Sequence, residues 1–113
     1  MTSAWEERRR APRVPVRAGH VYMRSTWSTV QLLDISVGGA LLATSRLFNV
    51  GRRGELRGIL GDERVAVQVE VRREELTAPA DQPGAVRCAV AFVAIDESSR
   101  RGLEKFLRHR VSA

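Results

Sequence analysis

The sequence predicts a mainly β fold: a small antiparallel β-barrel of six to seven strands with a C-terminal α-helix. Short stretches in which apolar and polar residues alternate recur along the chain, separated by glycine, proline and other turn residues, as in antiparallel barrels. Only the last stretch changes to the spacing of a helix. Strands and helices do not alternate, which excludes a doubly wound sheet.

The first half of the chain is expected to contain an arm and five short strands. Residues 1–13 are expected to form a flexible arm, and residues 14–113 the barrel with its helix. The strands are expected over residues 14–17, 20–24, 27–33, 39–44 and 55–60. The second of these strands can also be a continuation of the first. The fourth is expected to be the hairpin partner of the third, which ends at a turn beginning with Asp34.

The second half contains the clearest β pattern. Gly61-Asp62 is typical of a hairpin turn, and valine then occupies every second position over residues 65–71. A flexible loop is expected over residues 77–84. Residues 86–95 are apolar on both faces, which predicts a strand that is covered on both sides.

The last segment is predicted to be a helix over about residues 97–110. Its apolar stripe consists of Leu103, Phe106 and Leu107. Asp96 or Ser98 can serve as the N-cap. Gly102 weakens such a helix by about 1 kcal/mol relative to alanine, so we expect the helix to persist by docking its stripe on the sheet.

Length and composition indicate one globular domain. The chain has 113 residues, of which 43% are hydrophobic and 28% charged. It contains no apolar run of the roughly 18 residues needed to cross a membrane and no apolar signal region at its N-terminus. Cys88 is the single cysteine, so neither a disulfide framework nor a cysteine metal site is expected. We expect a cytoplasmic protein.

Catalysis and metal binding are not expected. Nucleophilic catalysis needs a Ser or Cys beside a base, and the sequence has only two separated histidines, His20 and His109, which we expect to be structural or surface residues. Clustered carboxylates with metal-ligand spacing and a Walker-type phosphate loop are also missing from the sequence. We therefore expect neither an enzyme nor a cofactor or a metal ion.

The charge of the chain favours an anionic partner. The net charge is +6, and all but one of the 19 basic residues are arginine, Lys105 being the exception. A coding bias towards arginine would account for this total. It accounts less well for the six arginines within the first 24 residues, which create a local positive field. The planar guanidinium group suits phosphates and the edges of bases.

Residues 34–39 can form half of a binding site. The Asp34 carboxylate is a natural acceptor for the N1–H and amino group of guanine, with the Ser36 hydroxyl in support. Gly38 and Gly39 would supply positive φ angles and a close backbone approach. The alternative is a purely structural hairpin turn in which Asp34 bonds to nearby backbone N–H groups.

The arm can supply the other half. Arg9 and Arg13 are four residues apart and share one side of either an extended segment or a helix, so their guanidinium groups can converge on one ligand. Arginine binds guanine O6 and N7 in a bidentate manner and also binds phosphates. The alternative is a solvated arm without a ligand.

Together, Arg9-x-x-x-Arg13 and Asp34-x-Ser36-x-x-Gly39 resemble the paired RxxxR and D/NxSxxG motifs of PilZ domains. The resemblance extends from about residue 7 to residue 107 and includes the small barrel and the closing helix. One departure is Ala89, which stands where the family often has glycine.

This resemblance implies a stand-alone receptor for the bacterial second messenger cyclic di-GMP. By matching position, the arginines would wrap over the ligand, while the turn would lie under it on the barrel surface. The implied ligand-binding residues are Arg8, Arg9, Arg10, Arg13, Asp34, Ser36, Gly38 and Gly39. Such a module signals through a downstream protein, which the sequence does not identify. Motility, exopolysaccharide regulation and adhesion are all compatible processes.

Two alternatives stay open. One is a PilZ-fold adaptor that binds a partner protein without binding cyclic di-GMP, since folds persist after a ligand is lost. The other is a small basic barrel that binds nucleic acid. Aromatic residues make up only 5% of the chain, which leaves little for a base-stacking platform and disfavours this alternative.

Overall fold

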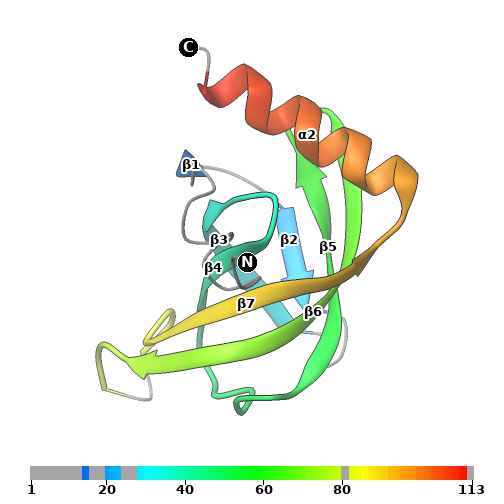
Figure 1. Ribbon diagram of the computed structural model, residues 1–113. Coiled ribbons are helices and arrows are strands. Elements are labelled where there is room, and N and C mark those ends of the chain that lie inside the picture. Colours follow the sequence, from blue (N-terminus) through cyan, green and yellow to red (C-terminus); the bar gives the residue numbers. More distant parts are fainter. Residues whose placement is uncertain (1–13, 16–19, 24–27, 80–81, 112–113) are drawn as a thin grey trace, which may run out of the picture.

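The structure, a computed structural model, describes residues 14–15, 20–23, 28–79 and 82–111. Within these ranges the chain forms seven strands and one helix (Figure 1). The elements are β1 Val14–Pro15, β2 His20–Met23, β3 Ser28–Ile35, β4 Gly39–Thr44, β5 Arg53–Leu60, β6 Glu63–Leu76, β7 Val86–Ile95 and α2 Glu97–Val111. The predicted mainly β fold with a C-terminal helix is confirmed.

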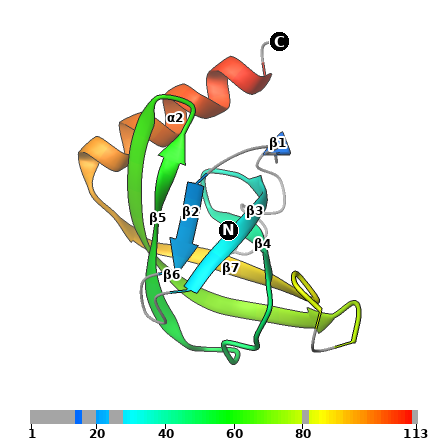
Figure 2. The ribbon, with the colours of Figure 1, turned by 180° about the vertical axis from the view of Figure 1, so that it is seen from behind.

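The strands pair in a closed order. Along the sheet, β3, β2, β5, β6, β7 and β4 are neighbours, and β4 pairs again with β3. Every pairing is antiparallel. β1 pairs with the end of β3, while β2 pairs with its beginning, as Figure 2 shows from behind. This ring of strands encloses an apolar core, as expected for a small barrel.

The period-2 pattern of β6 supplies one wall of that core. Val65, Val67, Val69 and Val71 are all buried, whereas the residues between them are half-buried or exposed. Phe48, from the connection between β4 and β5, is also buried in the core. Glu74 holds this connection in place, because its two carboxylate oxygens accept the N–H groups of Phe48 at 2.7 Å and Asn49 at 2.9 Å.

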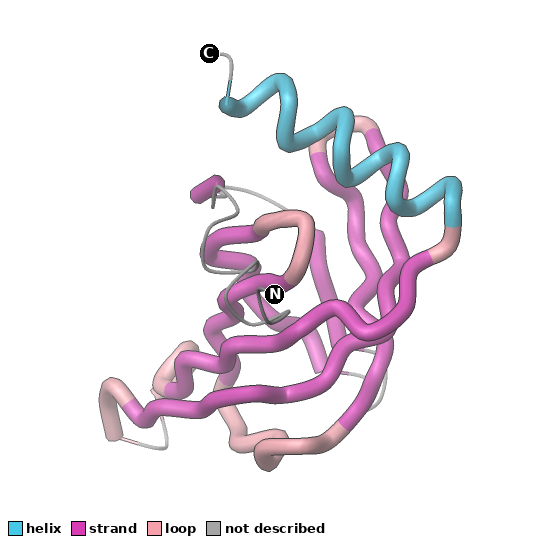
Figure 3. Tube along the Cα trace, in the orientation of Figure 1, coloured by secondary structure: helices cyan, strands magenta, loops and turns pink. Residues whose placement is uncertain are grey.

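The helix lies across one end of the barrel, where it packs mainly against β6 (Figure 3), and its apolar stripe is buried, as predicted. Asp96 is the N-cap, because its carboxylate accepts the N–H group of Ser99 at 2.7 Å. The Ser99 hydroxyl in turn accepts the Ala66 N–H at 3.0 Å and ties the helix to β6. Gly102 serves the same contact, since a Cβ there would lie 3.2 Å from the Glu63 Cβ.

Three details of the predicted strands are corrected. β3 does not end before Asp34 but continues through Ile35, because both residues pair with β1 and β4. β5 begins at Arg53, two residues before the predicted start at residue 55. β7 is not covered on both sides along its whole length: Val93 is 37% exposed. Val93 is the extra residue at an irregularity in the pairing with β6, and it lies beyond the part of β7 that pairs with β4.

Candidate functional site

The turn between β3 and β4 has its shape set by Ser36. Its N–H donates to the Gly39 carbonyl at 2.8 Å, and its hydroxyl oxygen accepts the Gly38 N–H at 3.3 Å. The hydroxyl also donates to the Gly39 carbonyl at 3.4 Å. Ser36 is 0% exposed. The Ser36 hydroxyl therefore makes its hydrogen bonds inside the turn. From the sequence alone, a similar bonding to the turn backbone was an open alternative for the Asp34 side chain.

Gly39 allows two strands to approach closely. A Cβ at this position would lie 2.5 Å from the Val90 carbonyl oxygen of β7, closer than real Cβ contacts. The Phe92 N–H donates to the Gly38 carbonyl at 2.9 Å and fastens the turn to the same strand. The close approach seen at Gly39 is therefore between β4 and β7, and the predicted approach to a ligand stays a prediction.

The predicted positive φ angles at Gly38 and Gly39 are wrong. Among the residues that the structure describes, the glycines with positive φ are at positions 51, 61 and 84. The turn at residues 36–38 closes through the Ser36 hydrogen bonds, and β4 begins at Gly39 in extended backbone. Glycine is needed here for space, and left-handed backbone is not required.

Asp34 lies on the outer face of the barrel. Its neighbour Ile35 is buried in the core, and successive side chains of a strand point to opposite faces. Asp34 is half-buried, and a shift in the pairing with β4 makes Leu33 the extra residue before it. The strand thus presents the carboxylate two residues before the turn formed by Ser36.

Apolar residues form the floor beside Asp34. The register places Leu41 of β4 opposite Asp34, and Ala89 of β7 opposite Leu41. Gly39 and Ala91 form the neighbouring pair on the same face, but both are buried, so the accessible part of this surface is at Leu41 and Ala89. Leu41 and Ala89 are both half-buried. The result is a low apolar surface next to a carboxylate, on which a flat ring can lie. The alanine that replaces the family's glycine, Ala89, belongs to this floor.

Strand β1 borders this surface on the side of Asp34. Val14 is paired with Ile35, and Pro15 with Asp34. The predicted ligand residues Arg8, Arg9, Arg10 and Arg13 lie outside the described residues. Arg13 nevertheless directly precedes Val14 in the sequence, and consecutive Cα atoms are about 3.8 Å apart. The arginine motif therefore ends one residue from a strand that borders Asp34.

The rest of the described chain offers little reactive chemistry. Burial, with a smaller contribution from the Glu74 carboxylate, raises the pKa of the Cys88 thiol from 9.0 to about 12, so the thiol is protonated and unreactive at neutral pH. Within the part that the structure describes, no three His, Cys, Asp or Glu side chains gather as metal ligands. No helix in that part is long and apolar enough to cross a membrane.

Two contributors to the site were missed from the sequence. The pairing of Pro15 with Asp34 joins segments that no local pattern connects. Leu41 and Ala89 were not predicted as site residues, because both lie in apolar runs whose two faces the sequence does not distinguish.

The chain matches the family model of the PilZ domain over residues 7–109. No curated protein matches it. Among solved structures, it is similar to the inhibitor of motility MotI (DgrA) of Bacillus subtilis, with a TM-score of 0.69 and 17% identity. It is also similar to the MrkH–c-di-GMP complex of K. pneumonia, with a TM-score of 0.72 and 16% identity. In both comparisons 91% of this chain covers 52% of the other, so the chain spans about half their length.

A third similar structure has nearly the size of this chain. It is the PilZ domain of YcgR from Escherichia coli with c-di-GMP, with a TM-score of 0.66 and 16% identity. The alignment covers 93% of this chain and 92% of that one. At these identities the similarity concerns the fold.

Proposed function

The chain belongs to the PilZ domain family, and from this membership we propose that it is a cytoplasmic receptor for cyclic di-GMP that relays the signal to a partner protein. The observation that carries the proposal is the pairing of β1 with β3, which brings the residues directly after the arginine motif beside Asp34. Structures similar to this chain include two complexes with the same dinucleotide, which supports the choice of ligand.

Recognition is proposed to use both halves of the motif. The Asp34 carboxylate accepts the N1–H and amino group of one guanine, an edge that presents only donors. Residues 1–13 act as an arm in which Arg9 and Arg13 bind phosphates or guanine O6 and N7, assisted by Arg8 and Arg10. Each half is complementary to a different edge of the ligand.

The turn is proposed to contribute through its shape. Ser36 is buried and bonded within the turn, so its effect on the ligand is to hold residues 36–39 in place. Gly38 is fastened to Phe92 through its carbonyl, and Gly39 admits the close approach to β7. A rigid turn lowers the ordering cost of binding.

Signalling is proposed to follow from ordering the arm. Ligand binding fixes the arm on the barrel and thereby changes the surface that a downstream protein meets. Ordering a segment weakens the net affinity, so we expect a micromolar dissociation constant, which corresponds to a binding free energy of about −8 kcal/mol. Motility is one candidate process, because MotI is an inhibitor of motility; exopolysaccharide production is another. The role is that of a receptor, without turnover of the ligand.

Isothermal titration with cyclic di-GMP tests the proposal. We expect the wild-type chain to release heat with a micromolar midpoint, and Arg9→Ala and Asp34→Ala to lose most of it. No heat from the wild type at high micromolar ligand would overturn the proposal. A pull-down in which partner binding changes neither with cyclic di-GMP nor with Arg9→Ala would instead favour the adaptor alternative. Nucleic acid binding with a steep salt dependence and no preference for the dinucleotide would favour the basic barrel.

A further inference from the structure

Arg73 of β6 lies in the same cross-strand row as Asp34. The register pairs Asp34 with Leu41, Leu41 with Ala89, and Ala89 with Arg73, so the row crosses β3, β4, β7 and β6. Neighbouring strands are about 4.8 Å apart, so three spacings separate the ends of the row by roughly 14 Å along the sheet. An arginine side chain at one end and a carboxylate at the other can therefore contact one dinucleotide between them.

The middle of this row is low and apolar. Leu41 and Ala89 are half-buried and accessible, whereas the adjacent pair on the same face, Gly39 and Ala91, is buried. No charged side chain interrupts the row between its ends. A ligand that rests on this floor can reach Asp34 and Arg73 together.

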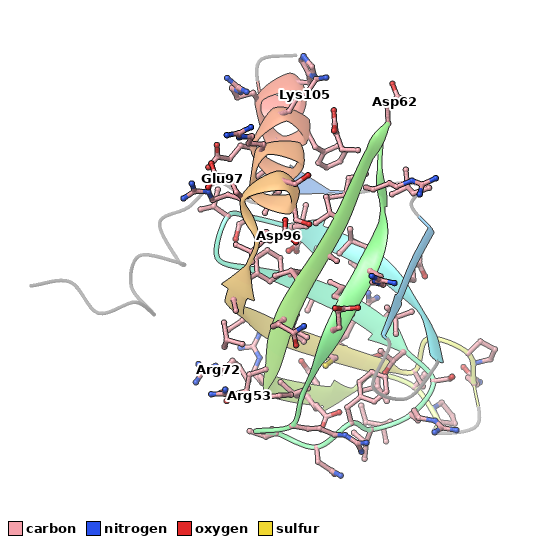
Figure 4. The ribbon with its side chains drawn as sticks, turned by 90° about the vertical axis from the view of Figure 1, so that its right-hand side faces the viewer. Arg53, Asp62, Arg72, Asp96, Glu97 and Lys105 are labelled. Carbon is pink, nitrogen blue, oxygen red and sulfur yellow. The ribbon has the colours of Figure 1, made fainter. Side chains whose placement is uncertain are left out.

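The Arg73 side chain is exposed and makes no ion pair or side-chain hydrogen bond with the residues that the structure describes. Its neighbour Arg72 differs: its guanidinium binds Glu70 at 3.1 Å, and the same carboxylate is bound by Arg53 at 3.1 Å. Arg53 and Arg72 lie together on one side of the barrel (Figure 4). The nearby carboxylate of Glu70 is therefore already shared between two arginines, which leaves the charge of Arg73 available.

A shift in the pairing of β6 with β7 explains how Arg73 reaches the outer face. The register changes between Val71 and Arg73, so Arg72 is the extra residue of a bulge. A bulge re-aims the side chains that follow it. In a regular strand every second side chain lies on the same face, so without the bulge Arg73 would share the face of Val71 and point into the core. The bulge instead places it opposite the outward-facing Ala89.

We propose that Arg73 is a further ligand contact, supplied by the barrel, and that it binds a phosphate of the dinucleotide whose guanine is held at Asp34. The inference rests on the proposed function. Its physical reason is that a carboxylate attracts the donor edge of guanine and repels phosphate, so the phosphates must lie away from Asp34. Along this row the next cation in that direction is Arg73, and a charge-assisted contact between arginine and phosphate is among the stronger hydrogen bonds.

Titration of three variants tests the inference. Arg73→Ala should weaken cyclic di-GMP binding about tenfold, the effect of losing one charge-assisted contact. Arg73→Lys should recover part of that loss, because it keeps the charge without the planar fork. The matched control is Arg64→Ala, which removes an exposed arginine from the other end of β6, opposite Ile59. It should change the affinity less than twofold.

The outcomes separate this inference from the proposed function. If the wild type binds and Arg73→Ala binds as tightly as Arg64→Ala does, the contact is overturned while the receptor function stands. If the wild type does not bind cyclic di-GMP, both the Arg73 contact and the receptor function are overturned. Thermal unfolding of each variant without ligand should give the wild-type midpoint, because both arginines are exposed; this confirms that an affinity change reports on the contact itself.

Discussion

Pro15 lies directly opposite Asp34 where β1 pairs with β3. Partners in an antiparallel pair have Cα atoms about 4.5–5.5 Å apart, so the end of the arginine segment and the carboxylate share one edge of the barrel. Arg13 comes two residues before Pro15 in the sequence, so the arginine motif ends directly before the two β1 residues that pair with Ile35 and Asp34.

The spacing between Arg13 and Val14 should matter for affinity. Inserting Gly-Ser between them keeps every charge but moves the arginines by two residues relative to Asp34. We expect cyclic di-GMP affinity to fall at least about tenfold, since a preorganised geometry is lost. The control is the same insertion between Gln82 and Pro83, which are exposed in the loop between β6 and β7. Equal affinity in the two insertion variants would contradict the role of the pairing.

Removing the Asp34 carboxylate should weaken guanine binding. Hydrogen bonds to charged groups contribute about 1.5–3 kcal/mol, so Asp34→Ala should raise the dissociation constant roughly 10- to 100-fold. Asp62→Ala removes the same charge from an exposed position at the tip of the β5–β6 hairpin (Figure 4) and should leave the affinity unchanged. Titration calorimetry measures both. A comparable loss in the two variants would point to general electrostatics.

Gly39→Ala should destabilise the barrel. The new Cβ would lie 2.5 Å from the Val90 carbonyl oxygen, so β4 and β7 must separate. Overpacking of this kind typically costs about 1–3 kcal/mol. Urea denaturation should therefore show a lower midpoint than for the wild type. An unchanged midpoint would mean that β4 and β7 can separate without lowering the free energy of unfolding, which would contradict this prediction.

Ser36→Ala should lower stability even without ligand. The substitution leaves the Gly38 N–H without its hydroxyl acceptor and removes a buried hydrogen-bonding group. We expect a loss of about 1–2 kcal/mol in the free energy of unfolding. Chemical denaturation of the ligand-free chain measures it. Wild-type stability combined with lost binding would instead assign the hydroxyl to the ligand.

The buried thiol predicts a pH dependence at the alkaline end. The pKa of Cys88 is raised to about 12 in the folded chain from 9.0, so above pH 9 the unfolded state loses its proton first. Stability contributed by the protonated thiol is therefore present below pH 9 and declines between pH 9 and 12, by up to about 1.4 kcal/mol per pH unit. Comparing denaturation of the wild type and Cys88→Ala across this range isolates the effect: the variant should show the shallower decline.

Local patterns were enough to predict most of the elements. The alternating valines of β6, the glycine-containing turns and the helical stripe around Phe106 each depend on residues close in sequence, because periodicity reflects which face of an element is buried. The motif at residues 34–39 was recognisable for the same reason. The irregularities were not: the extra residues Leu33, Arg72 and Val93 depend on how one strand meets the next.

The sequence by itself thus determined the fold class, the family motifs and the side chains able to bind a guanine. Only the tertiary structure decided that Pro15 pairs with Asp34, that Ser36 is buried in its own turn, and that a bulge turns Arg73 outwards. The physical reason is that register between strands distant in sequence is set by packing across the whole barrel, and a shift of one residue moves a side chain from the core to the surface.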